Sequence, residues 1–333
     1  MIFGAICRFL SNFAAQMDIV VYYNSDTKID VECAATIGVF DGVHLGHRML
    51  LSELKNDAMK AGLKTMAITF DRHPRQLFDA NYKPQLLTAQ KDKEFMLSIL
   101  GVSLDYVVVL PFTMEMAQLS AHDFMQQVLK DRLNVKLLRL GYDNRFGHGR
   151  TDGFDDYVRY GREMGIKVLQ SKPLQLKGYS EPVSSSLIRR LVAEDGNVKD
   201  AMALLKRPFY LNGTVKPGEH IGSTLGFPTA NLEPDDDGKL IPAPGVYAVW
   251  AILGYGFIKP AMMNIGTRPT FNGQKQTLEV NIFDFEGDLY GKRIVVQFVE
   301  RLRDERRFES PEALVAQLEE DKKLTLEIIN KNE

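Results

Sequence analysis

Residues 36–51, TIGVFDGVHLGHRMLL, decide how the first half of this 333-residue chain folds. The apolar residues 36–40 predict a buried parallel strand, and the Asp41-Gly42 pair predicts a turn. From Arg48 the apolar residues recur at helical spacing, and Gly62 predicts the end of that helix. Strand, glycine-bearing turn and helix in this order leave unpaired N–H groups and a positive helix end where anions bind in open α/β sheets.

Two histidines, His44 and His47, lie at the predicted start of this helix. Imidazoles three residues apart at a helix start can face one anion, where they neutralise charge that develops on a phosphate without acting as nucleophiles. A tight strand-to-helix turn with surface histidines is the alternative. The string G-x-F-D-G-x-H-x-G-H favours a nucleotide site and resembles the signature of the HxGH nucleotidyltransferase superfamily. Its other candidate nucleotide-binding residues are Gly38, Phe40, Asp41 and Gly42.

The composition limits the possible classes of function. Lys and Arg number 41 against 43 Asp and Glu, and the net charge of −2 argues against a nucleic-acid scaffold. The two cysteines form no CxxC pair, which excludes a disulfide framework or zinc cluster and fits a reducing cytoplasm. No stretch is long enough to span a membrane. Residues 1–16 read as a weak signal peptide or, as we favour, an extension before a true start at Met17.

Strand and helix patterns alternate through the first half of the chain. One strand is predicted before the opening unit, at residues 18–23. The strands predicted after it are residues 63–70, 105–110, 135–140 and 166–169. Helical patterns end near residues 100, 133, 164 and 192, and Ser120 with Asp123 predicts a helix start. This alternation predicts an α/β domain with a doubly wound, Rossmann-like parallel sheet, whose loops gather at one edge.

Three polar loops follow these elements and are candidates for ATP or flavin contacts. Residues 71–75 carry His73, and residues 141–150 carry Asp143 and Arg145. Residues 183–189 place serines at a helix N-terminus with an arginine one turn in, which together can cradle pyrophosphate; the candidates there are Ser185, Ser186 and Arg189. Taken alone, the first loop also reads as a surface turn, and the third as a serine helix cap with a surface arginine.

Four segments together carry a specific resemblance. TIGVFDGVHLGH, TFDRHPR, GYDNRFGHGR and VSSSLIR resemble, in this order, the adenylyltransferase module of bacterial bifunctional riboflavin kinase/FAD synthetases. The resemblance implies that this module moves the adenylyl group of ATP to FMN and releases pyrophosphate. It implies that His44 and His47 stabilise the transition state, while Ser185, Ser186 and Arg189 hold the leaving pyrophosphate.

From Phe209 the alternation of strand and helix patterns gives way to short strand patterns with many Gly and Pro. The predicted strands are residues 209–215, 245–253, 261–265, 277–285 and 292–299, which indicate a compact antiparallel β-barrel. A short helix at residues 195–205 precedes them, and Ser310-Pro311 opens a terminal helix. We place the boundary near Leu205, with an adenylyltransferase domain at residues 17–204 and a riboflavin kinase domain at residues 205–333.

Residues 215–232, VKPGEHIGSTLGFPTANL, carry the chemistry of the second half. Thr229 and Asn231 point the same way in an extended segment, and their oxygens are hard ligands suited to Mg²⁺ on a nucleotide. Glu279 can accept a proton from a substrate hydroxyl. A kinked edge strand and a solvated carboxylate are the alternatives. Glycines let a loop approach phosphate closely, and the candidates are Gly218 and Gly222.

A second resemblance covers this half. GFPTANL, GVYAVWA, NIGTRPTF and LEVNIFDF resemble the riboflavin kinase module of the same family. The resemblance implies that Thr229 and Asn231 ligate Mg²⁺ and that Glu279 is the general base. It also implies that residues 301–308 and the last helix border a flavin pocket, with Arg303 and Phe308 as flavin-binding candidates. From the residues alone, the last helix is a terminal packing helix.

The two resemblances cover about residues 18–321 and imply a bifunctional enzyme that phosphorylates riboflavin to FMN and adenylylates FMN to FAD. The implied substrates are riboflavin, FMN and ATP with Mg²⁺, in a cytoplasmic monomer or weak homo-oligomer that binds neither nucleic acid nor membrane. An enzyme with only one activity and a non-catalytic flavin-binding regulator remain alternatives. The chain departs from the family at four positions. The family has Asn in place of Val39, an aromatic residue in place of Asn144, Arg in place of Ser223 and His in place of Asn281.

Overall fold

The computed structural model describes residues 20–22, 27–79, 81–99, 104–218, 225–254, 256–270 and 273–332. The chain divides into two compact units, Met17–Ser185 and one containing Ser186–Glu333, which we call the N-terminal and C-terminal units. The domain boundary between residues 204 and 205 stays a prediction. The predicted extension at residues 1–16 and the predicted start at Met17 lie outside the described residues.

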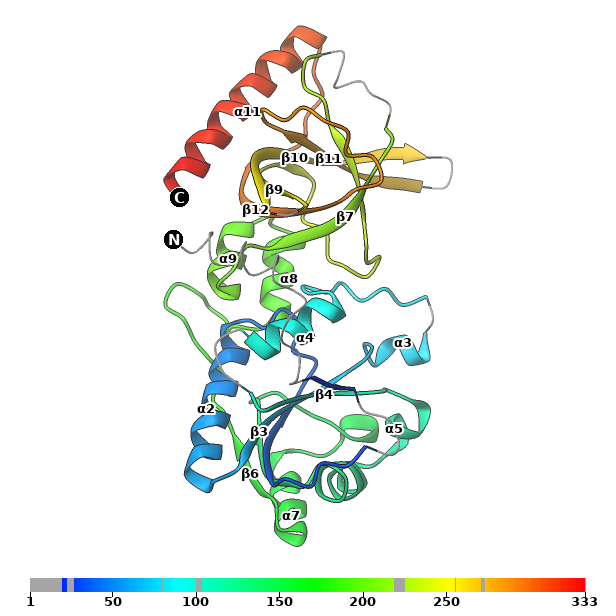
Figure 1. The fold of residues 1–333 in the computed structure, drawn as a ribbon, viewed down its shortest axis with the longest axis vertical. Helices are drawn as coiled ribbons and strands as arrows, with labels where there is room; N and C mark the ends of the chain where they lie inside the picture. The colour runs from blue at the N-terminus through cyan, green and yellow to red at the C-terminus, as the bar shows by residue number, and fades with distance from the viewer. Residues whose placement is uncertain are drawn as a thin grey trace. The chain divides into compact units, whose positions relative to one another are not determined.

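A parallel sheet forms the centre of the N-terminal unit (Figure 1). It has six strands in the order β1-β4-β3-β2-β5-β6. From β2 the chain runs to one side through β3 and β4 and then to the other side through β5 and β6. The neighbours β2 and β5 therefore flank a topological switch point, where open α/β sheets bind ligands. This sheet confirms the predicted doubly wound α/β fold. Its strands are β1 (Val20–Tyr22), β2 (Cys33–Ile37), β3 (Lys64–Phe70), β4 (Tyr106–Leu110), β5 (Val135–Leu140) and β6 (Lys167–Gln170).

The central strand β2 is buried on both faces. Ala34 packs with Leu54 and Ala58 of α2 on one face, whereas Cys33 and Ala35 belong to the larger cluster on the other. Burial on both faces explains why the strand is apolar, apart from the buried Thr36, rather than alternating. The helices of this unit are α2 (Leu45–Ala61), α3 (Arg75–Phe78), α4 (Gln90–Ile99), α5 (Met114–Gln118), α6 (Ala121–Asp123), the π-helix η1 (Phe124–Lys130), the 3₁₀ turn η2 (His148–Arg150) and α7 (Phe154–Met164).

The boundaries around the opening stretch differ from the prediction. The strand β2 ends at Ile37 and not at Phe40, because the backbone turns into the left-handed region at Phe40 with a φ of 51°. The helix begins at Leu45, before Arg48, because the side chain of His44 caps it. The predicted end of α2 at Gly62 is confirmed by a left-handed φ of 67° at that residue.

The predicted helix from Ser120 starts as expected but changes its winding. The hydroxyl of Ser120 accepts the N–H of Asp123 at 3.0 Å, which confirms the cap. After Asp123 the chain forms the π-helix η1, which ends at Lys130 and not at Leu133. The sequence pattern gave no sign of this wider winding, nor of the short helices α3 and α5, because a single turn of helix carries no periodicity.

The C-terminal unit contains a closed antiparallel barrel, which confirms the predicted barrel, and its strand order is β10-β11-β8-β7-β12-β9. The rings of Phe209, Tyr247 and Phe298 meet in its core, with centroids 5.3 to 6.0 Å apart. The strand β8 was not predicted, because Glu233 and Pro234 interrupt its pattern. The strands are β7 (Tyr210–Lys216), β8 (Ala230–Pro234), β9 (Gly245–Leu253), β10 (Phe257–Thr270), β11 (Gly273–Ile282) and β12 (Arg293–Arg303).

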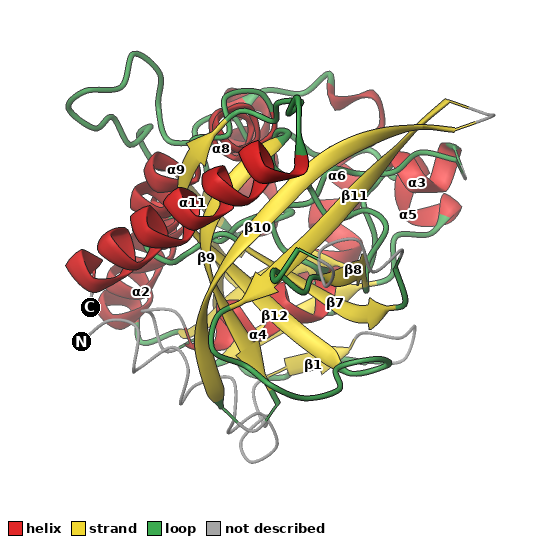
Figure 2. Cartoon of the chain, turned by 90° about the horizontal axis from the view of Figure 1, so that it is seen from above, coloured by secondary structure: helices red, strands yellow, loops and turns green. Residues whose placement is uncertain are grey.

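Helix α11 (Pro311–Asn332) lies across the outside of the barrel, over β9 and β10 (Figure 2). Its innermost residues are Asp321, Thr325 and Ile329, one on each turn, whereas the apolar residues nearer its start are only partly buried: Leu314, Val315 and Leu318. The two other helices near the start of this unit are α8 (Ser185–Ala193) and α9 (Val198–Leu205).

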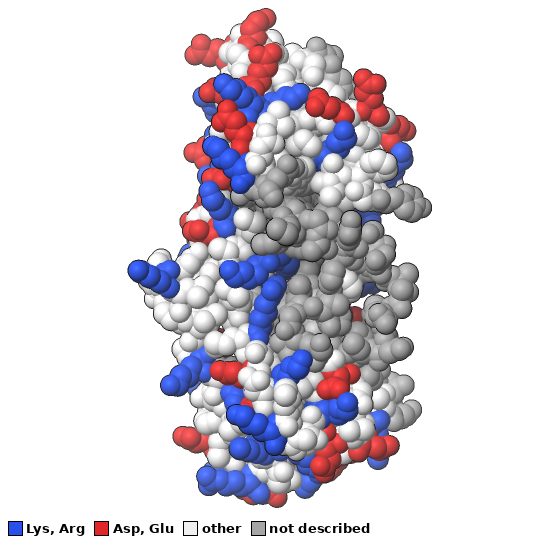
Figure 3. Space-filling view, turned by 60° about the vertical axis from the view of Figure 1, so that its left-hand side comes forward, with Lys and Arg blue, Asp and Glu red and all other residues white. Residues whose placement is uncertain are grey.

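The described surface carries charges of both signs. On the face drawn in Figure 3, acidic and basic side chains are interspersed over the described residues of each unit. This mixture agrees with the near balance of acidic and basic residues in the sequence. Among the described helices, none combines the length and the apolar character needed to cross a bilayer.

One buried ion pair ties α11 to the barrel. The guanidinium of Arg303 on β12 donates to both carboxylate oxygens of Asp321, at distances between 2.7 and 3.1 Å. The side chain of Asp321 is 3% exposed, and Gln317 donates a further hydrogen bond to it at 2.7 Å. A charged residue can occupy the inner line of this helix because its charge is paired and hydrogen-bonded.

We expect Asp321→Ala to lower the free energy of unfolding of the C-terminal unit by about 3 kcal/mol, because it leaves the Arg303 guanidinium without its counter-charge. The fluorescence of Trp250, the single tryptophan of the chain, reports urea unfolding of this unit. Glu320→Ala is the matched control, since it removes the same charge from an exposed neighbouring position. Equal losses in the two variants would contradict a stabilising pair.

Candidate active sites

The turn between β2 and α2 holds an unusual backbone. Phe40 and Val43 adopt φ angles of 51° and 43°, and Gly42 lies between them at 88°. A bulky residue and a β-branched residue rarely occupy this left-handed region, and such a conformation persists only where the surroundings fix it. Phe40 and Val43 are buried, and the N–H of Val43 donates to the carbonyl of Phe40 at 3.1 Å.

The carboxylate of Asp41 anchors this turn. It is 3% exposed and accepts the backbone N–H groups of Leu87 and Thr88, both at 3.1 Å. The carbonyl of Asp41 accepts the hydroxyl of Ser185 at 2.8 Å. Asp41 therefore joins three segments that are far apart in the sequence. The structure gives its side chain a positioning role, and direct contact with a nucleotide stays a prediction.

His44 and His47 are packed against each other at the start of α2. Their rings are stacked with centroids 3.7 Å apart, and Nδ1 of His44 accepts the N–H of His47 at 3.4 Å. His44 is buried, whereas His47 keeps part of its surface exposed. A Cβ at Gly46 would lie 3.1 Å from the His44 ring and from the Val183 carbonyl, so the glycine between them allows the close packing.

The environment of His47 favours its neutral form. Burial lowers the pKa of His47 well below 6.5, and the nearby charges of His44 and Lys93 lower it further. Its Nδ1 is buried and has no hydrogen-bond partner among the described residues. In the absence of nucleotide, these surroundings therefore favour a neutral, hydrogen-bonding His47, whereas a bound triphosphate would favour its protonation.

Lys93 on α4 was not a candidate in the sequence analysis. It is 4% exposed, its Nζ lies 3.5 Å from the Phe70 carbonyl, and burial lowers its pKa to about 8 despite the opposing charges of Asp41 and Glu94. A lysine within a polar helical stretch reads as solvent-exposed. The only signal in the sequence was its place on the buried face of α4, with Met96 and Leu97 close by on that helix.

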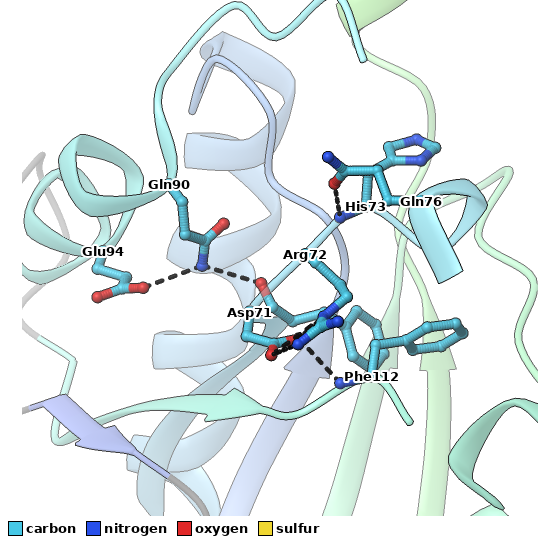
Figure 4. Close-up of polar contacts among 8 residues, drawn as sticks. Asp71, Arg72, His73, Gln76, Gln90, Glu94 and Phe112 are labelled. Carbon is cyan, nitrogen blue, oxygen red and sulfur yellow. Dashed lines mark hydrogen bonds and ion pairs between the residues drawn. The ribbon is translucent and has the colours of Figure 1, made fainter. Parts of the chain in front are cut away.

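The loop after β3 is held by the hydrogen bonds drawn in Figure 4. Asp71 accepts the N–H of Phe112 at 2.9 Å and pairs with Arg72 at 3.2 Å. The N–H of His73 donates to Gln76. Nδ1 of His73 accepts the N–H of Arg75 at 3.2 Å. One ring nitrogen of the predicted ligand-binding residue His73 therefore bonds its own loop.

The loop after β5 reaches across the switch point. The side-chain amide of Asn144 donates to the carbonyl of Ile37, the last residue of β2. The family departure at Asn144 thus forms a contact between the two strands that flank the crevice. Asp143 and Arg145, the two predicted contacts on either side of it, are exposed.

The predicted pyrophosphate cradle forms the start of α8. The hydroxyl of Ser185 donates its hydrogen to the Asp41 carbonyl, so this hydrogen is not directed at a phosphate. The first N–H groups of a helix are then the donors that suit an anion at this end. Ser186 is exposed and Arg189 is half-buried on the same helix.

In the barrel, Glu279 on β11 lies directly opposite Asn231 on β8. Opposed residues on neighbouring antiparallel strands point to the same face, with Cβ atoms about 5 Å apart. Leu278 and Val280, the sequence neighbours of Glu279, are buried, so Glu279 and Asn231 face outward from the barrel. Thr229 precedes β8 by one residue and shares the side of Asn231 where the segment is extended.

Two contacts hold the Thr229–Asn231 segment. A Cβ at Gly218 would overlap Nδ2 of Asn231, so the main chain packs directly on that amide and a larger residue would require the amide to move. The amide of Asn281 donates to the carbonyl of Pro228 at 2.7 Å, which gives this family departure a positioning role. The predicted phosphate-loop residue Gly222 and the departure at Ser223 lie outside the described residues.

The two flavin-binding candidates have partners within the barrel unit. The guanidinium of Arg303 donates hydrogen bonds to Asp321 and to the carbonyl of Asp304. The ring centroid of Phe308 lies 5.7 Å from Cζ of Arg303 and 4.9 Å from Cζ of Arg306, in cation–π geometry. Arg303 thus supports the fold, and a flavin contact by either residue stays a prediction.

Comparisons with known proteins agree with this division into two sites. The family model described as FAD synthetase matches residues 26–187, and the model described as riboflavin kinase matches residues 205–329. A protein from Streptococcus pneumoniae, whose crystal structure is described as that of a macrolide-efflux protein, superposes with a TM-score of 0.81. It is 31% identical, and the match covers 92% of this chain and 98% of that one.

Curated relatives cover both units. Proteins named bifunctional riboflavin kinase/FMN adenylyltransferase are 39% identical over 290 residues in Escherichia coli K12 and 34% identical over 304 residues in Listeria monocytogenes. These matches cover 87% and 90% of this chain, and 90% and 94% of the relatives. With identity above 30% across nearly the whole of both chains, this chain belongs to the bifunctional riboflavin kinase/FMN adenylyltransferase family.

Proposed function

We propose that this chain converts riboflavin to FMN in its C-terminal unit and FMN to FAD in its N-terminal unit, with one ATP consumed at each step. Matches to both family models and to bifunctional relatives support the two activities. Strand register supports the assignment of the kinase site, because it sets Glu279 opposite Asn231 in the C-terminal unit. The His44–His47 turn lies in the N-terminal unit and supports the assignment of adenylyl transfer to that unit.

In the kinase reaction, the terminal ribityl hydroxyl of riboflavin attacks the γ-phosphorus of ATP, and ADP leaves. A neutral hydroxyl must lose its proton as the new O–P bond forms, and Glu279 would accept it. Thr229 and Asn231 would hold a divalent metal on the same face, and Mg²⁺ is the ion we propose. Such an ion neutralises phosphate charge when it is bound.

The donor set fits a metal that arrives with the nucleotide. No group of three or more His, Cys, Asp and Glu side chains among the described residues could hold a metal ion. One hydroxyl oxygen and one amide oxygen complete too few coordination sites for Mg²⁺ alone, whereas nucleotide phosphates and water supply the remainder. The main chain at Gly218 packs closely on the amide of Asn231, which supports a defined orientation for this ligand.

In the adenylyl transfer, a phosphate oxygen of FMN attacks the α-phosphorus of a second ATP, and pyrophosphate leaves. The substrate supplies the nucleophile already ionised, so the protein needs no nucleophile or general base. The residues at the start of α2, His44 and His47, would donate hydrogen bonds to the phosphates, together with the helix N-terminus. Ser186, Arg189 and the backbone at the start of α8 would hold the pyrophosphate; Gly38, His73, Asp143 and Arg145 remain further candidates for ATP or flavin contacts.

We propose a cytoplasmic enzyme that acts on small molecules as a monomer or weak homo-oligomer, without a nucleic-acid or membrane partner. The balanced charge and the scarcity of cysteine support this view. Incubation with riboflavin, ATP and Mg²⁺, followed by chromatography, tests the two activities. FMN as the only product would indicate a kinase alone, FAD formed only from added FMN would indicate an adenylyltransferase alone, and the absence of both products would indicate a flavin-binding regulator.

We expect variants of the two sites to have reciprocal effects. His47→Ala should abolish FAD formation from FMN and leave FMN formation unchanged, because the adenylyl transfer loses a phosphate-binding group. Glu279→Ala should lower FMN formation at least 100-fold, since a general base contributes about 10² to 10⁴ to the rate, and should leave FAD formation from supplied FMN unchanged. Product chromatography measures both. Loss of both reactions in either folded variant would contradict the division into two sites.

A second prediction concerns the charge of Lys93. Its folded-state pKa of about 8 lies below the value of 10.5 for an exposed lysine. Between these two pH values the unfolded chain keeps a proton that the folded chain has released, so the free energy of unfolding should rise with pH across this window. Relative to Lys93→Met, the wild type should gain about 3 kcal/mol between pH 8 and pH 10.5.

NMR signals of the N-terminal unit provide the measurement, in urea titrations at each pH, because the single tryptophan lies in the other unit. Lys91→Met, at an exposed position of the same helix, is the matched control and should show no such gain. If the wild type and Lys93→Met changed in parallel with pH, the lysine would titrate as an exposed residue.

A further inference from the structure

A row of side chains crosses the outer face of the barrel beside Glu279. Glu279 opposes Asn231 on one side and Asn264 of β10 on the other. Directly opposed residues point to the same face of a sheet, with Cβ atoms about 5 Å apart. Asn264, Glu279 and Asn231 therefore form three consecutive polar positions, with the carboxylate in the middle.

Burial agrees with this placement of Asn264. Its sequence neighbours Met263 and Ile265 are 0% exposed and belong to the interior face of β10, whereas Asn264 is half-buried on the other face. Among the described residues, the carboxamide of Asn264 makes no side-chain hydrogen bond. A carboxamide carries two donor hydrogens and an acceptor oxygen, and a half-buried one without partners is placed to bind a polar ligand.

The row also changes character from one end to the other. Beyond Asn231, the register places Lys216, which is exposed and pairs with Glu233 at 3.1 Å. Beyond Asn264 it places Val246, which is 4% exposed. The order is therefore a cation, an amide beside the proposed metal, a carboxylate, a second amide and an apolar residue. A triphosphate, a polyol and an aromatic ring system follow one another in the same order in the two substrates.

We propose that Asn264 is a further substrate-binding residue of the kinase site, whose carboxamide hydrogen-bonds the ribityl hydroxyl next to the one that is phosphorylated. This inference rests on the proposed riboflavin kinase function. The amide can accept the hydrogen of that hydroxyl or donate to its oxygen, and either bond holds the polyol so that the terminal hydroxyl lies beside Glu279. Asn231 would act on the ATP side of the Glu279 carboxylate, and Asn264 on its riboflavin side.

The test compares riboflavin with an analogue that lacks the hydroxyl next to the terminal one. For Asn264→Ala, kcat/KM for riboflavin should fall about 10-fold or more, while the KM for ATP stays within twofold of the wild-type value. With the deoxy analogue, the wild type and Asn264→Ala should have equal kcat/KM, because the partner of the amide is missing in both cases. A purely structural role would lower kcat/KM for the two substrates by the same factor.

Two controls support the comparison. Thr267→Ala changes an exposed residue on the same strand and should leave both substrates unaffected. Asn264→Ser retains one hydrogen-bonding group in a smaller side chain and should lose less activity than Asn264→Ala, and unchanged thermal unfolding shows that both variants fold.

Two results would overturn the inference while leaving the kinase assignment intact. The first is a wild-type rate for Asn264→Ala with riboflavin, and the second is an equal loss with riboflavin and with the analogue. A wild-type chain that makes no FMN from riboflavin would overturn the proposed function and this inference together, so the two failures are distinguishable.

Discussion

The buried carboxylate of Asp41 determines the path of the chain through the N-terminal site. The turn that contains it holds two non-glycine residues in left-handed conformations, which cost of order 1 to 3 kcal/mol each and need surroundings that fix them. Asp41 fixes the turn because its carboxylate accepts two backbone N–H groups near the start of α4, and its backbone carbonyl accepts the Ser185 hydroxyl. Because the turn is fixed, His44 can cap α2 and stack on His47.

Strand register has the corresponding role in the barrel. The β8–β11 pairing sets Glu279 opposite Asn231, and a slip of one residue would move Glu279 into the apolar interior. The register of β8 with β11 is given by two residue pairs, Glu279 with Asn231 and Val280 with Ala230. Asn281 adds a constraint through the Pro228 carbonyl, and the main chain at Gly218 packs closely on Asn231. Both sites thus depend on side chains that fix an irregular segment of backbone.

Local patterns in the sequence predicted the parts of this structure that local forces decide. The strand–turn–helix unit, the Gly62 helix end and the Ser120 cap each depend on residues a few positions apart, and the structure has all three. The roles of Asp41 and Arg303 depend on partners 46 and 18 residues away, so these residues read as ligand contacts in the sequence. Lys93 was missed for the same reason, because its burial comes from the packing of α4 and not from its neighbours in the chain.

The two sites differ because their nucleophiles differ. A ribityl hydroxyl is neutral and must lose a proton to attack phosphorus, so its site needs a carboxylate beside the nucleotide, and Glu279 is the residue that we propose for this role. The phosphate of FMN is already ionised, and a carboxylate facing it would repel it. In the N-terminal site, the carboxylate of Asp41 is buried and its oxygens accept backbone N–H groups, while the start of α2 offers imidazoles and a positive helix end. The chemistry of each acceptor therefore accounts for the placement of acid in one unit and of hydrogen-bond donors in the other.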